Sequence, residues 1–420
     1  MATPGFPPWS LLCALGALLA ALWCAGRALA GAWLGPRRVA RALRSQGVRG
    51  TAYRFPSGDM KEYARLVAAA CCQPMPLSSH AVAARAVPFD HAVIKQHGKV
   101  ALTWFGPEPR VVVSDPTLFR EILSNKQGLF GKQRSILRIE RLMANGLTTH
   151  QGDKWVAHRR IINHAFHLEK LKRMLPAFAD CSSELVRRWG NSMGQGQDDV
   201  QEIDVWPEFQ NLTGDVISRV AFGSSFSEGR RIFRLQSEQA QNAVKMANVM
   251  YIPGYRFLPT KLNRRMKANA REVEVLLKGI ITKRERAMKD VHADNDDLLG
   301  VMMESNIKES QEAGSSTPTM TTEDIVGELK LFYFAGMETT AVLLTWTMVL
   351  LSMHPEWQDR AREEVLRVFG DKQPDYEGMN RLKVVSALPI YNRGGYAISN
   401  RVAALNMYIY FVGAGDNDTS

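Results

Sequence analysis

Apolar positions recur every three to four residues over most of the chain, and this spacing predicts a mostly helical protein. The pattern differs near the amino-terminal end, where residues 99–105 and 110–114 read as two β-strands. The turn residues Gly106 to Pro109 separate them, which predicts a hairpin. Helical spacing is clear in five later segments, residues 152–166, 168–195, 207–221, 228–247 and 265–290. The predicted fold class is therefore mainly α with a small β-sheet.

Two shorter segments contain distinctive polar signals. Asp115 and Pro116 supply an N-cap and a first-turn proline for a helix that continues to about Ser124. Residues 305–320 are rich in Ser, Thr and Glu. That composition predicts a mobile surface loop.

The first 35 residues are apolar apart from one charge. No charged residue lies between Trp9 and Gly26, and the apolar run resumes after Arg27. About 20 such residues span a bilayer as a helix. Basic residues then follow, so the positive-inside rule places the amino terminus in the lumen and the body in the cytosol; they are Arg37, Arg38, Arg41, Arg44 and Arg49. A cleaved signal peptide is the alternative, but it needs a basic region before its apolar core, and none is present.

The longest predicted helix covers residues 322–354. Thr321 and Asp324 have capping-box spacing at its start, and Pro355 stops it. At 1.5 Å per residue this helix is about 50 Å long, enough to cross a whole domain. A second transmembrane span is the alternative, but it would place Glu338 near mid-bilayer at a cost of about 2.5–3.5 kcal/mol. We therefore predict a buried central helix.

The net charge limits the classes of binding partner, and the cysteines bear on the cellular compartment. The formal net charge of +11 favours acidic partners, meaning anionic membrane lipid or an acidic protein. Nucleic acid is not predicted, because the chain has no zinc-finger spacing and no aromatic-plus-basic signature. The cysteines form no recognisable disulfide framework, which agrees with a cytosolic body; they are Cys13, Cys24, Cys71, Cys72 and Cys181.

The middle of the long helix places an acid and two alcohols in apolar surroundings, from Ala335 to Thr340. Reductive activation of oxygen needs protons, and a carboxyl beside a buried hydroxyl can relay them from solvent. Glu338 and Thr339 are therefore the candidate catalytic residues. Ala335 and Thr339 share one helical face, and the small Ala335 and Gly336 would let a flat ligand approach the backbone. The alternative is a buried acid with only a local hydrogen bond.

A second candidate pair is Trp155 and Arg159. They are four residues apart, so the indole N–H and the guanidinium point the same way on a helix. The pair suits a carboxylate, to which Arg159 would donate a charge-assisted hydrogen bond. In isolation the pattern is weak, because Trp and Arg at this spacing more often pack or bridge.

Together these segments resemble the cytochrome P-450 family, and in particular the plant group that includes secologanin synthase. Residues 336–340 are similar to the oxygen-binding helix of the family, and residues 155–159 to its haem-propionate helix. Residues 166–175, 204–213 and 251–259 are similar to the plant group. The resemblance implies a haem cofactor, an endoplasmic-reticulum enzyme facing the cytosol, and electrons from NADPH through a flavoprotein reductase. It also implies a small hydrophobic, terpenoid-like substrate.

The resemblance runs from the anchor to about Val385 and then stops. The family continues with a Glu-x-x-Arg helix and a loop whose cysteine holds the haem iron, and residues 386–420 resemble neither. Glu364 and Arg367 match Glu-x-x-Arg by letters, but they lie where the family has the preceding helix. No cysteine follows Cys181, so the axial thiolate that favours O–O cleavage is missing and no metal ligand is assigned. We therefore expect an incomplete cytochrome P-450 fold, from a spliced, frameshifted or misassigned reading frame.

These expectations divide the chain into an anchor over residues 1–35, a partial catalytic domain over 36–385, and a tail over 386–420. Two functions stay open: a haem monooxygenase by lineage, inactive as this chain, and a non-enzymatic membrane-anchored remnant. In the family, residues 128–145 and 248–259 shape the substrate pocket, but nothing in them names a ligand.

Overall fold

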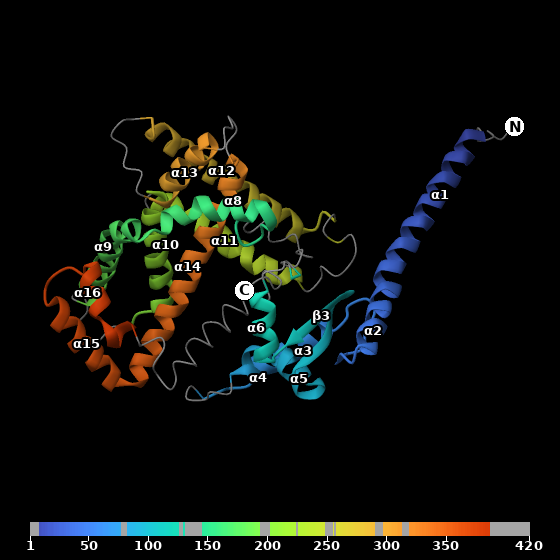
Figure 1. Ribbon diagram of the computed structural model, residues 1–420, viewed down its shortest axis with the longest axis horizontal. Helices are drawn as coiled ribbons and strands as arrows, with labels where there is room; N and C mark the ends of the chain where they lie inside the picture. Colours follow the sequence, from blue (N-terminus) through green and yellow to red (C-terminus); the bar gives the residue numbers. More distant parts are fainter. Residues whose placement is uncertain are drawn as a thin grey trace. The chain divides into compact units, whose positions relative to one another are not determined.

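The computed structural model describes residues 8–76, 82–125, 129–130, 145–193, 202–223, 226–247, 255, 258–289, 297–312 and 319–386. The chain forms two compact units, Met1–Leu129 with Met246–Leu258, and Phe130–Lys245 with Pro259–Ser420. Helices make up most of the described residues, and their one sheet lies in the first unit (Figure 1). The predicted mainly helical fold with a small sheet is confirmed.

The first unit begins with a long exposed helix. Helix α1 (Pro8–Leu29) continues through a π-helical turn (Ala30–Leu34) into α2 (Gly35–Ser45). Large apolar side chains of α1 are exposed, as suits a helix that lies in lipid; they include Leu15, Leu18, Leu19, Leu22 and Trp23. Arginines follow on α2, where the guanidinium of Arg37 lies 3.7 Å from the centre of the Trp33 ring.

The sheet has three strands in the order β1 (Arg49–Gly50), β2 (Val100–Phe105) and β3 (Glu108–Val113). Strands β2 and β3 form the predicted antiparallel hairpin, in which Val100 pairs with Val113, while β1 lies parallel to β2. The central strand is the buried one, because Ala101, Leu102 and Trp104 are at most 2% exposed.

Three short helices lie between β1 and β2 in the sequence: α3 (Met60–Cys72), α4 (Ala83–Ala86) and α5 (Pro88–His97). A fourth, α6 (Pro116–Ser124), follows β3. Helix α6 begins where it was predicted, since the Asp115 side chain accepts hydrogen bonds from the N–H groups of Thr117 and Leu118. The other three helices were not predicted. Phe89 and Val93 of α5 pack on Ala101 of β2.

The second unit is helical throughout its described part. Its longer helices are α8 (Gly152–Asn163), α9 (Leu168–Met193), α10 (Val205–Phe222), α11 (Phe226–Ala247), α12 (Lys261–Ala287), α13 (Leu298–Glu312), α14 (Thr322–Met353) and α15 (Pro355–Phe369). A short 3₁₀ helix (His164–Phe166) joins α8 to α9, and α16 (Tyr376–Arg381) follows α15. The five helices predicted from spacing are all present, with ends that differ by a few residues.

Helix α14 lies at the centre of this unit, beside α10 (Figure 1). Its Thr321–Asp324 capping box is present, as predicted. Eight of the nine residues from Ile325 to Tyr333 are buried, and the Tyr333 ring stacks on Phe222 with centroids 4.1 Å apart. By length and composition α14 is also the one described helix that is apolar enough to cross a membrane. Its packed first half shows that it is a core helix here.

The predicted mobile loop over residues 305–320 is wrong in its first half, because α13 continues to Glu312. Two of the polar residues that suggested a loop, Asn306 and Ser310, are buried and form hydrogen bonds with the backbone of Thr319 and Met320. Asn306 donates to the Met320 carbonyl at 2.9 Å and accepts from the Met320 N–H at 2.8 Å. Ser310 accepts from the Thr319 N–H at 3.1 Å. Polar composition alone does not separate such internal partners from solvent-facing side chains.

Three predicted segments lie almost entirely outside the described residues. They are the two substrate-pocket segments, 128–145 and 248–259, and the tail after Ser386.

Candidate functional site

Helix α8 presents Trp155 and Arg159 on its exposed side. Trp155 is 37% exposed, and Arg159 is exposed as well. Three residues of the same helix are buried: His158, Ile161 and Ile162. No ion pair of Arg159 occurs among the described residues. Both side chains are thus exposed on α8, and their binding of a carboxylate stays a prediction.

On α14 the hydroxyl of Thr339 donates to the Ala335 carbonyl at 2.7 Å. The two residues share one face, as predicted, and the hydroxyl oxygen keeps its lone pairs for a second partner. Gly336 has another reason to be small. A side chain there would meet Ile217 of α10 at 2.8 Å. Close packing of α10 on α14 thus accounts for this glycine, and ligand approach at Gly336 stays a prediction.

Glu338 is half-buried, and its partner comes from α10. Gln210 donates to its carboxyl at 3.4 Å, a long hydrogen bond. Burial raises the pKa of Glu338, and the hydrogen bond from Gln210 offsets part of that rise. One turn along α10, the Thr213 hydroxyl lies 3.0 Å from the Met337 carbonyl. The carboxyl is thus placed to hold a proton inside the unit.

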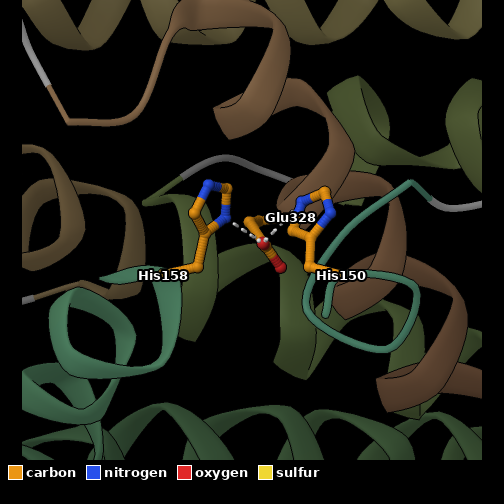
Figure 2. Close-up of side chains that lie close together, drawn as sticks. All are labelled: His150, His158 and Glu328. Atoms are coloured by element: carbon orange, nitrogen blue, oxygen red, sulfur yellow. Dashed lines mark hydrogen bonds and ion pairs between the residues drawn. The ribbon is translucent and has the colours of Figure 1, made fainter. Parts of the chain in front are cut away.

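A second group of titratable residues lies near the start of α14 (Figure 2). Glu328 is fully buried, and its carboxylate lies 2.8 Å from the Nδ1 atom of His158. The other carboxylate oxygen accepts the Leu147 N–H at 2.8 Å. The His150 ring lies edge-on to the His158 ring, with centroids 4.5 Å apart. Donor atoms of the two histidines and Glu328 all lie within 4.8 Å of one another.

Cys181 is the one cysteine of the second unit, and it is buried in α9. Its Sγ lies 3.4 Å from a carboxylate oxygen of Asp215. Burial and the neighbouring Asp215 raise the pKa of the Cys181 thiol to about 12. Cys181 is therefore a protonated thiol and does not suit an iron ligand, which must be a thiolate.

Glu364 has a structural role. Its buried carboxylate accepts the backbone N–H groups of Lys383, Val384 and Val385 at 2.8–3.0 Å. Burial alone would raise the pKa of Glu364, but these three donors outweigh it and hold the pKa below its ordinary value. Arg367 forms no hydrogen bond with Glu364 among the described contacts. Glu364 thus fastens the segment after α16 to α15.

Comparison with known proteins identifies the family. The sequence profile of the cytochrome P450 family matches residues 74–388, about three quarters of the chain. The chain belongs to the cytochrome P450 family. The profile match ends three residues after Val385, where the resemblance was predicted to stop.

Plant members of the family are the similar relatives. The chain is 57% identical to cytochrome P450 CYP72A616 of Paris polyphylla over 382 residues, which are 90% of this chain and 73% of the relative. It is 47% identical to cytochrome P450 72A13 of Arabidopsis thaliana over 372 residues, covering 89% and 71%. Among solved structures, retinoic acid bound cyanobacterial CYP120A1 superposes with a TM-score of 0.59 at 18% identity, covering 80% of this chain and 68% of that one. That likeness supports the fold.

Membership implies a monooxygenase lineage with a haem cofactor and electrons from NADPH through a reductase. The side chains present fit one edge of that cofactor. Arg159 and Trp155 suit its propionate carboxylates. For the thiolate side, the described part of the second unit offers only Cys181, whose buried Sγ is already hydrogen bonded to Asp215.

The sequence reading missed His150, His158, Glu328 and Gln210. His158 carried a usable signal, since it lies three and four residues before the buried Ile161 and Ile162 and so shares their face. Glu328 was visible as a charge inside an apolar helix. Gln210 gave no signal, because it meets Glu338 only when α10 packs against α14.

Proposed function

We propose that this chain derives from a haem-dependent monooxygenase that hydroxylates a small hydrophobic, terpenoid-like substrate with NADPH and O2. We further propose that the 420-residue chain does not catalyse this hydroxylation by itself. Family membership supports the first statement. The second rests on the cysteines, all of which precede residue 182, and on the protonated state of Cys181.

The haem, held by a thiolate, supplies the oxygen chemistry of the family. The proposed role of Arg159 is to bind a propionate through its guanidinium, with the indole N–H of Trp155 as second donor. Support comes from the exposure of both side chains and from the absence of a carboxylate partner for Arg159 among the described residues.

The proposed role of Glu338 is to hold and deliver a proton, with the Thr339 hydroxyl as the next carrier. The raised pKa of Glu338 favours this role, because a carboxyl that keeps its proton closer to neutral pH is a better general acid. The Thr339 oxygen can take a proton only as it releases its own, so in this role its O–H would turn from the Ala335 carbonyl toward the next acceptor. Ala335 and Gly336 are proposed to line the ligand side of this turn.

We also propose a single-pass protein of the endoplasmic-reticulum membrane with its body in the cytosol. The exposed apolar side chains of α1 and the arginines of α2 support this topology. The proposed parts are an anchor over residues 1–35, a partial catalytic domain over 36–385 and a tail over 386–420. A flavoprotein reductase is the proposed electron donor of the lineage.

The observation that carries the proposal is the exposed Trp155–Arg159 pair on α8. It is tested by titrating the purified chain with hemin and with hemin dimethyl ester, which lacks the propionate charges. We expect the wild-type chain to bind hemin more tightly than the ester, and R159A to lose that preference. Equal affinities in the wild type would contradict the assignment.

A carbon monoxide difference spectrum of the reduced chain tests the proposed inactivity. We expect no thiolate-type Soret band, because no described cysteine is suited to hold iron. A thiolate-type band, or turnover of a hydrophobic compound with NADPH and reductase, would overturn this part of the proposal.

The second candidate function is a membrane-anchored remnant that binds no haem. It is favoured by the apolar side chains left exposed on α8, on α9 and between them, where a soluble enzyme would cover them; they include Val156, Phe166, Leu168 and Phe178. A folded chain with no hemin affinity would select this candidate.

A further inference from the structure

The buried carboxylate of Glu328 joins three segments of the second unit. It extends from α14, accepts the Leu147 N–H of the loop before α8, and lies 2.8 Å from His158 of α8 itself. Figure 2 shows the two imidazoles on either side of this carboxylate. Glu328 is 0% exposed and His158 is 1% exposed, so water does not compete for these contacts.

Two glycines let the segments approach this closely. A side chain at Gly146 would meet the Glu328 carboxylate at 2.6 Å, and one at Gly327 would meet the Asn145 carbonyl. The loop backbone therefore lies directly on α14. The close approach brings the Leu147 N–H within reach of the carboxylate.

A divalent metal site is the competing interpretation of two histidines and a glutamate. The 2.8 Å separation of His158 Nδ1 and Glu328 is a normal hydrogen-bond distance. If Nδ1 of His158 were a metal ligand, Nε2 would have to donate its N–H to an acceptor, and the described residues offer it none. With the proton on Nδ1, Nε2 needs no acceptor. The geometry therefore favours a hydrogen bond from His158 to Glu328.

We propose that Glu328 is a positioning residue for haem binding, which it serves by fixing α8 through His158. The proposal rests on the proposed function of Trp155 and Arg159. His158 lies between them in sequence and is buried, whereas both of them are exposed. Any rotation or sliding of α8 would separate His158 from a buried carboxylate and leave its charge uncompensated. The exposed pair is thus held in place before a ligand arrives, which reduces the entropy lost on binding.

The test compares three variants of the full 420-residue chain. E328L removes both hydrogen bonds, and E328Q keeps one acceptor oxygen in place of the two that serve Leu147 and His158. L185A is the matched control, because Leu185 belongs to a different core cluster, with Phe209 and Ala341. Amide hydrogen exchange is followed over residues 145–163 without haem. The affinities for hemin and hemin dimethyl ester are then compared.

We expect E328L to exchange faster over residues 145–163 than both the wild type and L185A. We expect it also to lose the preference for hemin over the ester, as R159A does. E328Q, which keeps one of the two acceptor oxygens, should lie between the wild type and E328L in both properties. L185A should keep the preference for hemin, which a general loss of stability does not abolish.

Two results would overturn the proposal. One is exchange over residues 145–163 that does not differ between E328L and L185A. The other is a stoichiometric divalent metal that survives dialysis against a chelator and disappears in E328Q, which would make the cluster a metal site. If the wild-type chain shows no preference for hemin, the proposed function of Arg159 fails, while the exchange result still decides whether Glu328 fixes α8.

Discussion

Two acids of α14, ten residues apart, have opposite surroundings. Glu328 is fully buried, with His158 Nδ1 and the Leu147 N–H each 2.8 Å from its oxygens. Glu338 is half-buried and accepts one hydrogen bond of 3.4 Å from Gln210. A carboxyl with short, buried partners is fixed in place by its hydrogen bonds. A carboxyl with one long partner can gain and release a proton, which suits the role proposed for Glu338.

The surroundings of Glu338 make E338Q a stabilising substitution. Because burial raises the pKa of Glu338 above its ordinary 4.5, the folded chain binds this proton more tightly than the unfolded chain. The cost to stability therefore grows as the pH rises from 4.5 through the folded pKa, and then stays constant. Glutamine cannot ionise and avoids that cost.

We expect a higher midpoint of thermal unfolding for E338Q than for the wild type at pH 7, with the difference disappearing below pH 4.5. Differential scanning fluorimetry across this range measures it. A difference that grows at low pH would contradict the raised pKa. A substitution at a functional site commonly raises stability and lowers activity, and E338Q would be such a case.

At the scale of elements, the contact of α10 with α14 positions the oxygen-binding motif. Gln210, Thr213 and Ile217 of α10 all meet α14 between Gly336 and Glu338. Two of them form hydrogen bonds and the third occupies the space that Gly336 leaves open. The motif is therefore defined by two helices, although its recognisable residues all belong to one.

The packing at Gly336 predicts that replacing it with alanine changes stability in a direction that depends on Ile217. An alanine there would meet Ile217 at 2.8 Å, so G336A should destabilise the chain by about 1–3 kcal/mol. In an I217A background the space is open, and alanine should be favourable by up to about 1 kcal/mol, because it favours helix over glycine.

Denaturant unfolding of the four chains in this double-mutant cycle measures the coupling. Destabilisation by G336A of equal size in both backgrounds would show that Ile217 is not the obstacle. It would also return Gly336 to its predicted role in ligand approach.

For the molecule as a whole, the arrangement of charge and apolar surface determines how it would meet a membrane. Large apolar side chains of α1 are exposed, and four arginines follow on α2. In the proposed topology α1 is the anchor and the basic α2 stays on the cytosolic side.

Deleting residues 1–34 should release the chain from microsomes into the supernatant after alkaline carbonate extraction, whereas the full chain stays in the pellet. In sealed microsomes the body of the full chain should be digested by added protease. Asn211 begins an Asn-Leu-Thr glycan acceptor pattern and should carry no glycan. Replacing the α2 arginines Arg37, Arg38, Arg41 and Arg44 with glutamine is the matched control. It should disturb orientation while leaving membrane retention intact. A protected, glycosylated body would reverse the proposed topology.

Local chemistry made several elements predictable. Asp115 with Pro116, and Thr321 with Asp324, begin helices through hydrogen bonds to neighbours a few residues away. The β2–β3 hairpin pairs residues that a short turn already brings together. The end of the family match near residue 388 was likewise readable, because motif spacing survives in the linear chain.

Residues 305–312 show the limit of such reading. Asn306 and Ser310 looked solvent-facing by composition, yet they are buried and hold Met320 and Thr319. The helices α3, α4 and α5 were also unpredicted; α5 owes its place to apolar contacts with β2. In each case the deciding partner lies beyond the range of local spacing.

The sequence by itself determined the mainly helical fold and the family, because each depends on residue type and short spacing. Only the tertiary structure brought Gln210 to Glu338, Ile217 to Gly336, and His158 to Glu328. Those contacts join residues more than 100 positions apart, and burial gives them their strength. Helix packing that removes water therefore decides which of the acids on α14 holds the fold and which is left to hold a proton.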